Sequence, residues 1–84
     1  MKQVKMNTVV SSNVARIGYE PDIYRLHIEF KNGACYEYAN VSMDLYEKIM
    51  DSESIGRAIQ QHLVRSELHP AKMLRARTPK EGKI

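Results

Sequence analysis

The pattern of residues 24–38 constrains the fold of this chain more than any other stretch. Residues 24–30, with the sequence YRLHIEF, alternate strictly between apolar and polar side chains, which is typical of a β-strand with one buried face. Asn32-Gly33 follows, and this dipeptide is a strong signal for a hairpin turn. Tyr36 and Tyr38 then stand two residues apart. We therefore expect an antiparallel hairpin whose register decides which side chains are buried.

Two loop lengths are possible at this turn, and they bury opposite faces of the second strand. A two-residue turn pairs Ile28 with Glu37 and buries that carboxylate among apolar side chains. A three-residue loop over residues 31–33, with its glycine in a left-handed bulge, pairs Ile28 with Tyr36 and turns Glu37 outward. Burying an unpaired carboxylate costs more than any preference between turn types, so we expect the longer loop. Tyr36 and Tyr38 are then expected in the core, and not on an exposed face as stacking platforms for bases.

A further strand is expected before the hairpin. In residues 14–19, Ala15, Ile17 and Tyr19 alternate with their neighbours and form the predicted apolar side. Glu20-Pro21-Asp22 then gives a turn, because proline fixes its own φ and aspartate can bond nearby backbone.

Two helices are predicted after the hairpin. Ser42 is a candidate N-cap for a helix over about residues 43–51. Ser54 is a second candidate, for a helix over about residues 55–68 with its apolar positions on one side. A proline at position 70 disfavours helical geometry before it, and residues 71–76 could add a short helix.

This order of elements predicts an α+β fold. A three-stranded antiparallel meander would be packed on one face by two C-terminal helices, in the order β-β-β-α-α, and followed by a basic C-terminal tail. A chain of 84 residues has room for one small domain. We assign residues 1–9 to an N-terminal extension, residues 10–70 to the domain and residues 71–84 to the tail.

The positive charge is concentrated in this tail. Residues 1–69 carry 8 Lys/Arg and 9 Asp/Glu, whereas residues 70–84 carry five basic residues against one acidic residue. Such a tail can follow nucleic-acid phosphates, or it can serve only to keep the end of the chain solvated.

Other classes of protein are disfavoured by what the sequence lacks. No apolar run approaches the ~18 residues that a membrane span requires, and no signal-peptide pattern is present. The single cysteine, Cys35, excludes an internal disulfide, and no Cys-x-x-Cys motif exists. We expect a cytoplasmic protein that does not enter membranes.

Several short motifs, in this order, resemble the KTSC domain, a module named for the C-terminus of some lysyl-tRNA synthetases. They are Val10-Ser11-Ser12, Ile17-Gly18-Tyr19, the turn at residues 30–33, Tyr36-x-Tyr38, Val41, and Ser54-x-Gly56 followed by Leu63-Val64-Arg65. The resemblance covers about residues 10–70. The family also occurs as a stand-alone protein in bacteria and their phages, and the resemblance implies no catalytic activity.

The resemblance also bears on ligands. It implies RNA binding by association with the synthetase, which is an argument by analogy. This chain departs from the family at one place, since aromatic residues commonly follow the Ser-x-Gly motif and Arg57-Ala58-Ile59 follow it here.

The candidate binding residues lie on the second predicted helix and in the tail. Arg57, Gln61 and Arg65 stand one turn apart on its exposed side, a pattern that fits phosphate contacts or an ordinary solvated helix face. The candidate nucleic-acid- or phosphate-binding residues are Ser54, Gly56, Arg57, Gln61, Arg65, Lys72, Arg75 and Arg77.

Ser54 and Gly56 have two alternative interpretations. Exposed backbone N–H groups at a helix start can hold an anion, and Ser12 or Arg16 could assist if the first strand passes nearby. Alternatively, Ser54 is an ordinary cap, and the glycine allows close packing.

No metal, cofactor or catalytic site is expected. The three histidines and Cys35 lie on different predicted elements and lack metal-ligand spacing. His27, Glu29 and Glu37 share the outer face of the predicted sheet. A flat, exposed face of mixed charge neither excludes water nor shifts pKa values much, so we do not expect an enzyme.

The leading functional hypothesis is a small non-enzymatic module that binds RNA or another phosphate-bearing ligand. The rival is a protein-interaction or inhibitor module that uses a free sheet edge or the second helix, with a second copy of the chain among the candidate partners. A pocket that sequesters a small nucleotide is a third hypothesis.

Overall fold

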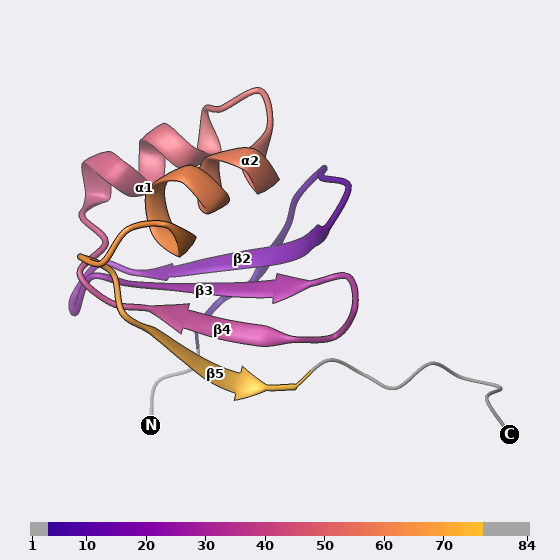
Figure 1. The fold of residues 1–84 in the computed structure, drawn as a ribbon, viewed down its shortest axis with the longest axis horizontal. Coiled ribbons are helices and arrows are strands. Elements are labelled where there is room, and N and C mark those ends of the chain that lie inside the picture. Colours follow the sequence, from indigo (N-terminus) through magenta and orange to yellow (C-terminus); the bar gives the residue numbers. More distant parts are fainter. Residues whose placement is uncertain (1–3, 77–84) are drawn as a thin grey trace, which may run out of the picture.

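Each strand pairs with the strand that precedes it in the chain, so the sheet has the order β1-β2-β3-β4-β5 and is antiparallel throughout. The computed structural model describes residues 4–76. Its elements are β1 (Asn7–Thr8), β2 (Val14–Glu20), β3 (Arg25–Phe30), β4 (Cys35–Tyr38), α1 (Met43–Met50), α2 (Ile55–Ile59), the π-helical turn η1 (Gln60–Val64) and β5 (Ala71–Arg75). The helices lie together over one face of the sheet (Figure 1), as the α+β assignment predicts.

Two edge strands widen the predicted three-stranded meander to five strands. At one edge, Asn7 of β1 pairs with Ile17 of β2. At the other edge, β5 pairs with β4, with Ala71 opposite Tyr38 and Arg75 opposite Cys35. The short helix predicted over residues 71–76 is therefore wrong. The free edge of β4 offers this segment a ladder of backbone hydrogen bonds, and such tertiary pairing overrides weak local preferences.

The hairpin has the predicted register. The pairs are Leu26–Tyr38, His27–Glu37, Ile28–Tyr36 and Glu29–Cys35. The Phe30 amide donates to the Ala34 carbonyl at 2.8 Å, and Gly33 has a φ of 94°, so the three-residue loop is confirmed. Tyr38 is buried, and burial raises the pKa of its phenol, whereas Tyr36 is only partly buried.

A bulge at the start of β2 changes the predicted alternation. Val14 pairs with Phe30, and Arg16 pairs with Glu29. Two steps along β2 therefore match one step along β3, and Ala15 is the extra residue. Val14 is fully buried as a result, although the alternation placed it on the side away from Ile17. An extra residue in one strand reverses the side on which the preceding residues lie.

The core lies between the sheet and the helices. Its buried members are Val14, Ile17, Leu26, Ile28, Tyr38, Val41, Ile49, Ala58, Ile59 and Leu63. Tyr19 fixes the start of α1 on this layer, because its hydroxyl donates to the Val41 carbonyl at 2.5 Å and its ring stacks on Tyr46 with centroids 4.5 Å apart. Ser42 caps α1 as predicted, since its hydroxyl accepts a hydrogen bond from the Leu45 amide at 3.2 Å.

The face of the sheet opposite the helices is less exposed than predicted. A side-chain Cβ at Gly18 would lie 2.6 Å from both Met6 and Val4, so the segment before β1 packs over this face. The side chains of Glu29 and Glu37 retain only 15% and 13% exposure. The expected flat, open face is therefore a partly covered layer of ion pairs.

The second helix is shorter than predicted. Five residues of α-helix continue into η1, and the chain leaves the helix at Arg65, whose amide donates to the Gln60 carbonyl at 3.1 Å. The chain then turns toward β5, and the Asn40 side-chain amide fixes that turn by donating to the Leu68 carbonyl at 3.1 Å. Within residues 4–76, no helical segment has the length and apolar character needed to cross a bilayer.

Candidate functional site

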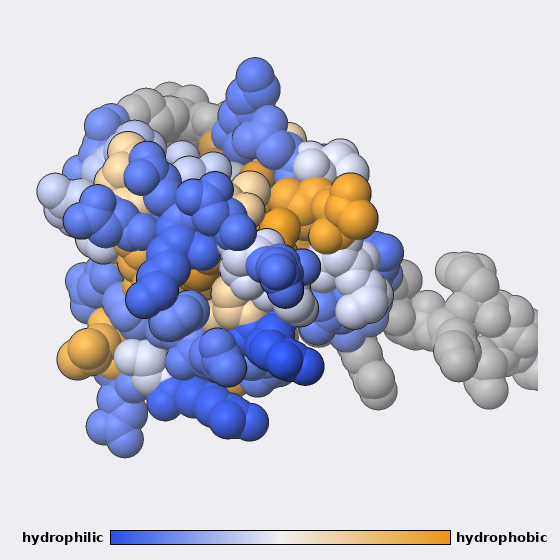
Figure 2. All heavy atoms as spheres, turned by 90° about the horizontal axis from the view of Figure 1, so that it is seen from above, coloured by the Kyte–Doolittle hydropathy of each residue, from blue (hydrophilic) through white to orange (hydrophobic). Residues whose placement is uncertain are grey.

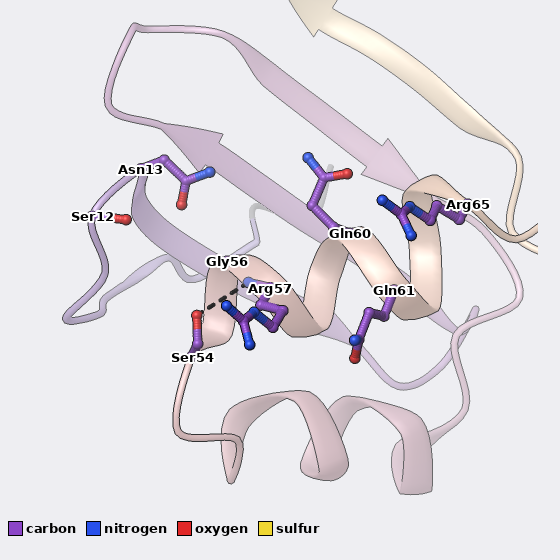
Figure 3. A pocket seen from close by; sticks show the side chains of 8 residues that line it. All are labelled: Ser12, Asn13, Ser54, Gly56, Arg57, Gln60, Gln61 and Arg65. Carbon is purple, nitrogen blue, oxygen red and sulfur yellow. Dashed lines mark hydrogen bonds between the residues drawn. The ribbon is translucent and has the colours of Figure 1, made fainter.

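A cavity of about 440 Å³ opens between the segment that leads into β2 and the helix formed by α2 and η1. Its lining residues are Ser12, Asn13, Ser54, Gly56, Arg57, Gln60, Gln61 and Arg65. Figure 3 shows Ser12 and Asn13 on the strand side, with the other labelled residues along the helix and at its start. Among the described residues, the lining contains no carboxylate, and its only charged groups are the two guanidinium groups.

Gly56 brings the two walls of this cavity into contact. A Cβ at this position would lie 2.4 Å from Asn13 Oδ1 and 3.5 Å from Ser11 Oγ. Moving the Asn13 side chain would break the hydrogen bond that its Oδ1 accepts from Ser11 Oγ at 3.2 Å, while its backbone carbonyl accepts from the Lys31 amide at 2.9 Å. The helix start can approach the segment before β2 this closely only because residue 56 has no side chain.

Ser54 acts as the cap of α2. Its Oγ accepts a hydrogen bond from the Arg57 amide at 3.3 Å, and its own amide donates to Ser52 Oγ at 3.1 Å. The Arg57 amide, which the anion hypothesis offered to a ligand, already has this partner. The neighbouring glycine allows close packing, as in the second of the two sequence interpretations.

Arg57 and Arg65 differ from the other arginines that the structure describes. Arg16, Arg25 and Arg75 each pair with a glutamate on the outer face of the sheet. In residues 4–76, no carboxylate forms an ion pair with the guanidinium group of Arg57 or Arg65. Within residues 4–76, Arg57 and Arg65 are thus the two arginines without an ion pair, and both line this cavity.

The π turn helps to bring Arg57 and Arg65 to one cavity. In a regular α-helix, residues eight apart are offset by about 80° around the axis. A π turn closes its hydrogen bond over five residues instead of four, so it rotates less per residue and reduces this offset. Gln61, between the two arginines, lines the same cavity.

Sequence reasoning missed Asn13 and Gln60 as lining residues. Gln60 lies next to the predicted stripe of Arg57, Gln61 and Arg65, but a period of 3.6 residues turns it away from that stripe, and the π turn has no local sequence signature. Asn13 comes from a segment distant in the sequence. The only sequence signal for it was Gly56, because a glycine at a helix start allows another segment to approach closely.

The remaining predicted site residues lie elsewhere. Lys72 is on the edge strand β5, opposite Glu37 of β4. Arg75 donates to the Gly33 carbonyl at 2.8 Å and to Glu29 at 2.7 Å, so its guanidinium group is already engaged. Arg77 lies outside the described residues.

A second cavity, of about 300 Å³, lies on the outer face and is lined by Cys35, His27 and Glu29 among others. Its carboxylate is paired, since both Arg16 and Arg75 hydrogen-bond Glu29 and hold its pKa below the ordinary value. In the described part of the chain, no three His, Cys, Asp or Glu side chains gather as a metal site would require.

Matches from comparison with known proteins agree on one family. A family model of the KTSC domain matches residues 10–66. An uncharacterized protein of Stutzerimonas stutzeri (strain A1501) is 33% identical over 61 residues, which are 73% of this chain and 82% of that protein. The crystal structure of a KTSC domain protein from Yersinia pestis is similar with a TM-score of 0.74 and 26% identity, covering 86% of this chain and 99% of that chain. All lining residues of the first cavity fall within the matched segment 10–66.

Proposed function

This chain belongs to the KTSC domain family, and from that premise we propose that it is a small non-enzymatic module that binds RNA in the cavity between β2 and the helix. The observation that carries the proposal is the pair of guanidinium groups, Arg57 and Arg65, which line one cavity without a carboxylate partner among the described residues.

The arrangement suits an extended polyanion better than a single small ion. Arg57 and Arg65 are eight residues apart, or about 12 Å along a helix axis, which matches more than one phosphate of a nucleic-acid strand. Between and beside them, Asn13, Gln60 and Gln61 offer neutral amides that can donate to phosphate or sugar oxygens. Because no carboxylate of residues 4–76 lines the cavity, a bound strand meets no like charge from this part of the chain.

The same lining supports a role in binding without catalysis. In the part of the chain that the structure describes, its only acidic or basic side chains are the two arginines, which stay protonated and cannot act as a general base. Ser12 and Ser54 line the cavity, but no histidine, carboxylate or lysine of residues 4–76 lines it to activate either hydroxyl. A cytoplasmic location, where RNA is available, is part of the proposal.

The test compares two double variants that each remove two positive charges. Arg57→Gln/Arg65→Gln changes the cavity, whereas Lys5→Gln/Lys48→Gln changes exposed residues elsewhere. By fluorescence anisotropy with a labelled RNA, the cavity variant is expected to bind about tenfold more weakly. Its plot of log affinity against log salt should become shallower by roughly 0.7 for each phosphate that it no longer neutralises. The lysine variant should stay close to wild type, and no binding of wild type to RNA or DNA at about 50 mM salt would remove the proposal.

A second candidate function is self-association through β5. All five of its residues are exposed, including Met73 at 57% and Leu74 at 47%, and among the described strands β5 pairs only with β4. Antiparallel pairing of two β5 strands about Met73 would place Lys72 opposite Leu74 of the second copy, so no like charges face each other.

A single variant tests this candidate. Leu74→Lys places like charges directly opposite each other at two positions of the paired strands and should convert a dimer to a monomer in multi-angle light scattering. If the wild-type chain remains monomeric up to a protein concentration of about 1 mM, the dimer would have a Kd above that value. Such weak self-association would exclude this candidate.

A further inference from the structure

Two cavities on the helix side of the sheet share the rings of Phe30 and Tyr36. One, of about 460 Å³, is also lined by Leu63, Val64 and residues of the turn that leads into β5. The other, of about 400 Å³, is also lined by Met73 of β5. We call the surface that both cavities form along β4 and β5 the aromatic groove.

The groove exists because β5 widens the sheet beyond the region that the helices cover (Figure 1). Tyr38 lies within the core, but Tyr36 and Phe30 are only partly buried, and their rings meet edge to face with centroids 6.0 Å apart. Met73, the partner of Tyr36 across the β4–β5 ladder, is 57% exposed. Phe30 and Tyr36 pack against the core, but because both are only partly buried they also present aromatic surface in the groove.

The end of η1 lies between this groove and the cavity of the proposed RNA site. Val64 lines the groove and the next residue, Arg65, lines the RNA cavity. A cation without an internal partner thus stands beside an apolar, aromatic surface. Glu67 also lines the groove, so a negatively charged backbone is favoured on the Arg65 side and repelled on the Glu67 side.

We propose that the ligand is single-stranded RNA, whose unpaired bases stack on Tyr36 and Phe30 in the aromatic groove while its phosphates contact Arg65 and Arg57. This inference rests on the proposed function and specifies its ligand. A nucleotide supplies both an apolar π-face and a negative charge, which the groove and Arg65 require together. An apolar peptide would fill the groove and leave both arginines unpaired. In a duplex the bases are stacked on each other and cannot enter.

The test measures binding to a single-stranded oligonucleotide and to a duplex of the same sequence. Tyr36→Leu removes the ring and should weaken binding of the single strand about tenfold, whereas Tyr36→Phe keeps a stacking surface and should bind as wild type does. Neither change should affect the duplex. Tyr24→Leu is the control, because Tyr24 is an exposed tyrosine at the β2–β3 turn. A 2-aminopurine base in the single strand should lose fluorescence on binding wild type and regain it with Tyr36→Leu.

A second variant covers the case in which Tyr36→Leu does not fold. Met73→Glu places a carboxylate at an exposed position in the groove and should likewise weaken the single strand. If the variants that fold bind the single strand as wild type does, or if wild type prefers the duplex, the stacking proposal is overturned. In that case, a loss of all RNA binding in Arg57→Gln/Arg65→Gln would still support the proposed function. If that variant also binds normally, both proposals fail.

Discussion

Gly56 determines how closely the start of α2 approaches the segment before β2. The space that its Cβ would fill contains Asn13 Oδ1, at 2.4 Å. Asn13 Oδ1 accepts a hydrogen bond from Ser11 Oγ, and the Asn13 backbone carbonyl accepts one from the Lys31 amide, so both parts of Asn13 already have a partner. The shape of the cavity between β2 and the helix therefore depends on a residue that contributes no side-chain atoms to it.

Gly56→Ala is expected to destabilise the fold by about 1 kcal/mol. Alanine favours helix over glycine by about 1 kcal/mol, but a contact this short costs about 1–3 kcal/mol in strain. Asn13→Ala removes the obstructing atoms, so the double variant should recover stability, with a coupling free energy of about 1 kcal/mol. Urea unfolding of the two single variants and the double variant measures this cycle. If the changes in the free energy of unfolding were strictly additive, there would be no steric conflict between a side chain at position 56 and Asn13.

At the scale of elements, Glu29 connects three strands of the sheet. The carboxylate lies on β3, Arg16 reaches it from β2, and Arg75 reaches it from β5 at 2.7 Å. The hydrogen bond from Arg16, followed by that from Arg75, lowers the pKa of Glu29 despite its partial burial. The last strand is thereby attached to the centre of the sheet by a charged contact as well as by its backbone ladder.

This contact predicts how stability depends on pH. The pKa of Glu29 is lowered from 4.5 in the folded state, so its stabilising contribution is present above that value and is lost as the pH falls through the lowered pKa. Glu29→Gln cannot change its charge, and its urea midpoint should therefore fall less steeply than that of wild type between about pH 6 and pH 3. Glu53→Gln, at an exposed glutamate before α2, is the control. Parallel curves for wild type and Glu29→Gln would contradict the prediction.

The elements also show what local pattern can predict. The hairpin register was predictable because the wrong register would bury Glu37. Strand β5 was not, because its formation depends on the free edge of β4 and not on its own sequence. The bulge at Ala15 and the π turn each depend on tertiary packing, and both shifted residues away from their expected sides.

At the scale of the whole molecule, charge is segregated and not in excess. Residues 4–76 contain nine Lys/Arg and nine Asp/Glu. Three arginines are paired on the outer face, while Arg57 and Arg65 remain free of ion pairs within the described residues. The face that carries the helices is mostly hydrophilic, with separate apolar patches (Figure 2). Arg57 and Arg65 could be predicted from helical spacing, whereas Asn13 could not, because only the folded chain brings it to Gly56.

The proposed RNA-binding roles of the tail and of the cavity can be tested separately. Neutralising Arg77, Lys80 and Lys83 in the full chain should weaken binding and should make the salt dependence shallower, by roughly 0.7 for each phosphate that the tail neutralises in wild type. It should leave the preference for single-stranded over duplex RNA unchanged, because the tail is expected to bind phosphates alone. Fluorescence anisotropy over a salt series measures both quantities. Loss of the strand preference in this variant would assign recognition to the tail and not to the cavity.

The two walls of the cavity come from parts of the chain more than forty residues apart, residues 12–13 and residues 54–65. A ligand that touches both walls fastens an early segment to a late one, so it can bind only when the whole domain is assembled. Occupancy and resistance to heat are then thermodynamically linked, and a ligand at one hundred times its Kd would add about 2.7 kcal/mol to the free energy of unfolding. A chain this small has a small hydrophobic core, so ligand binding would add substantially to its stability.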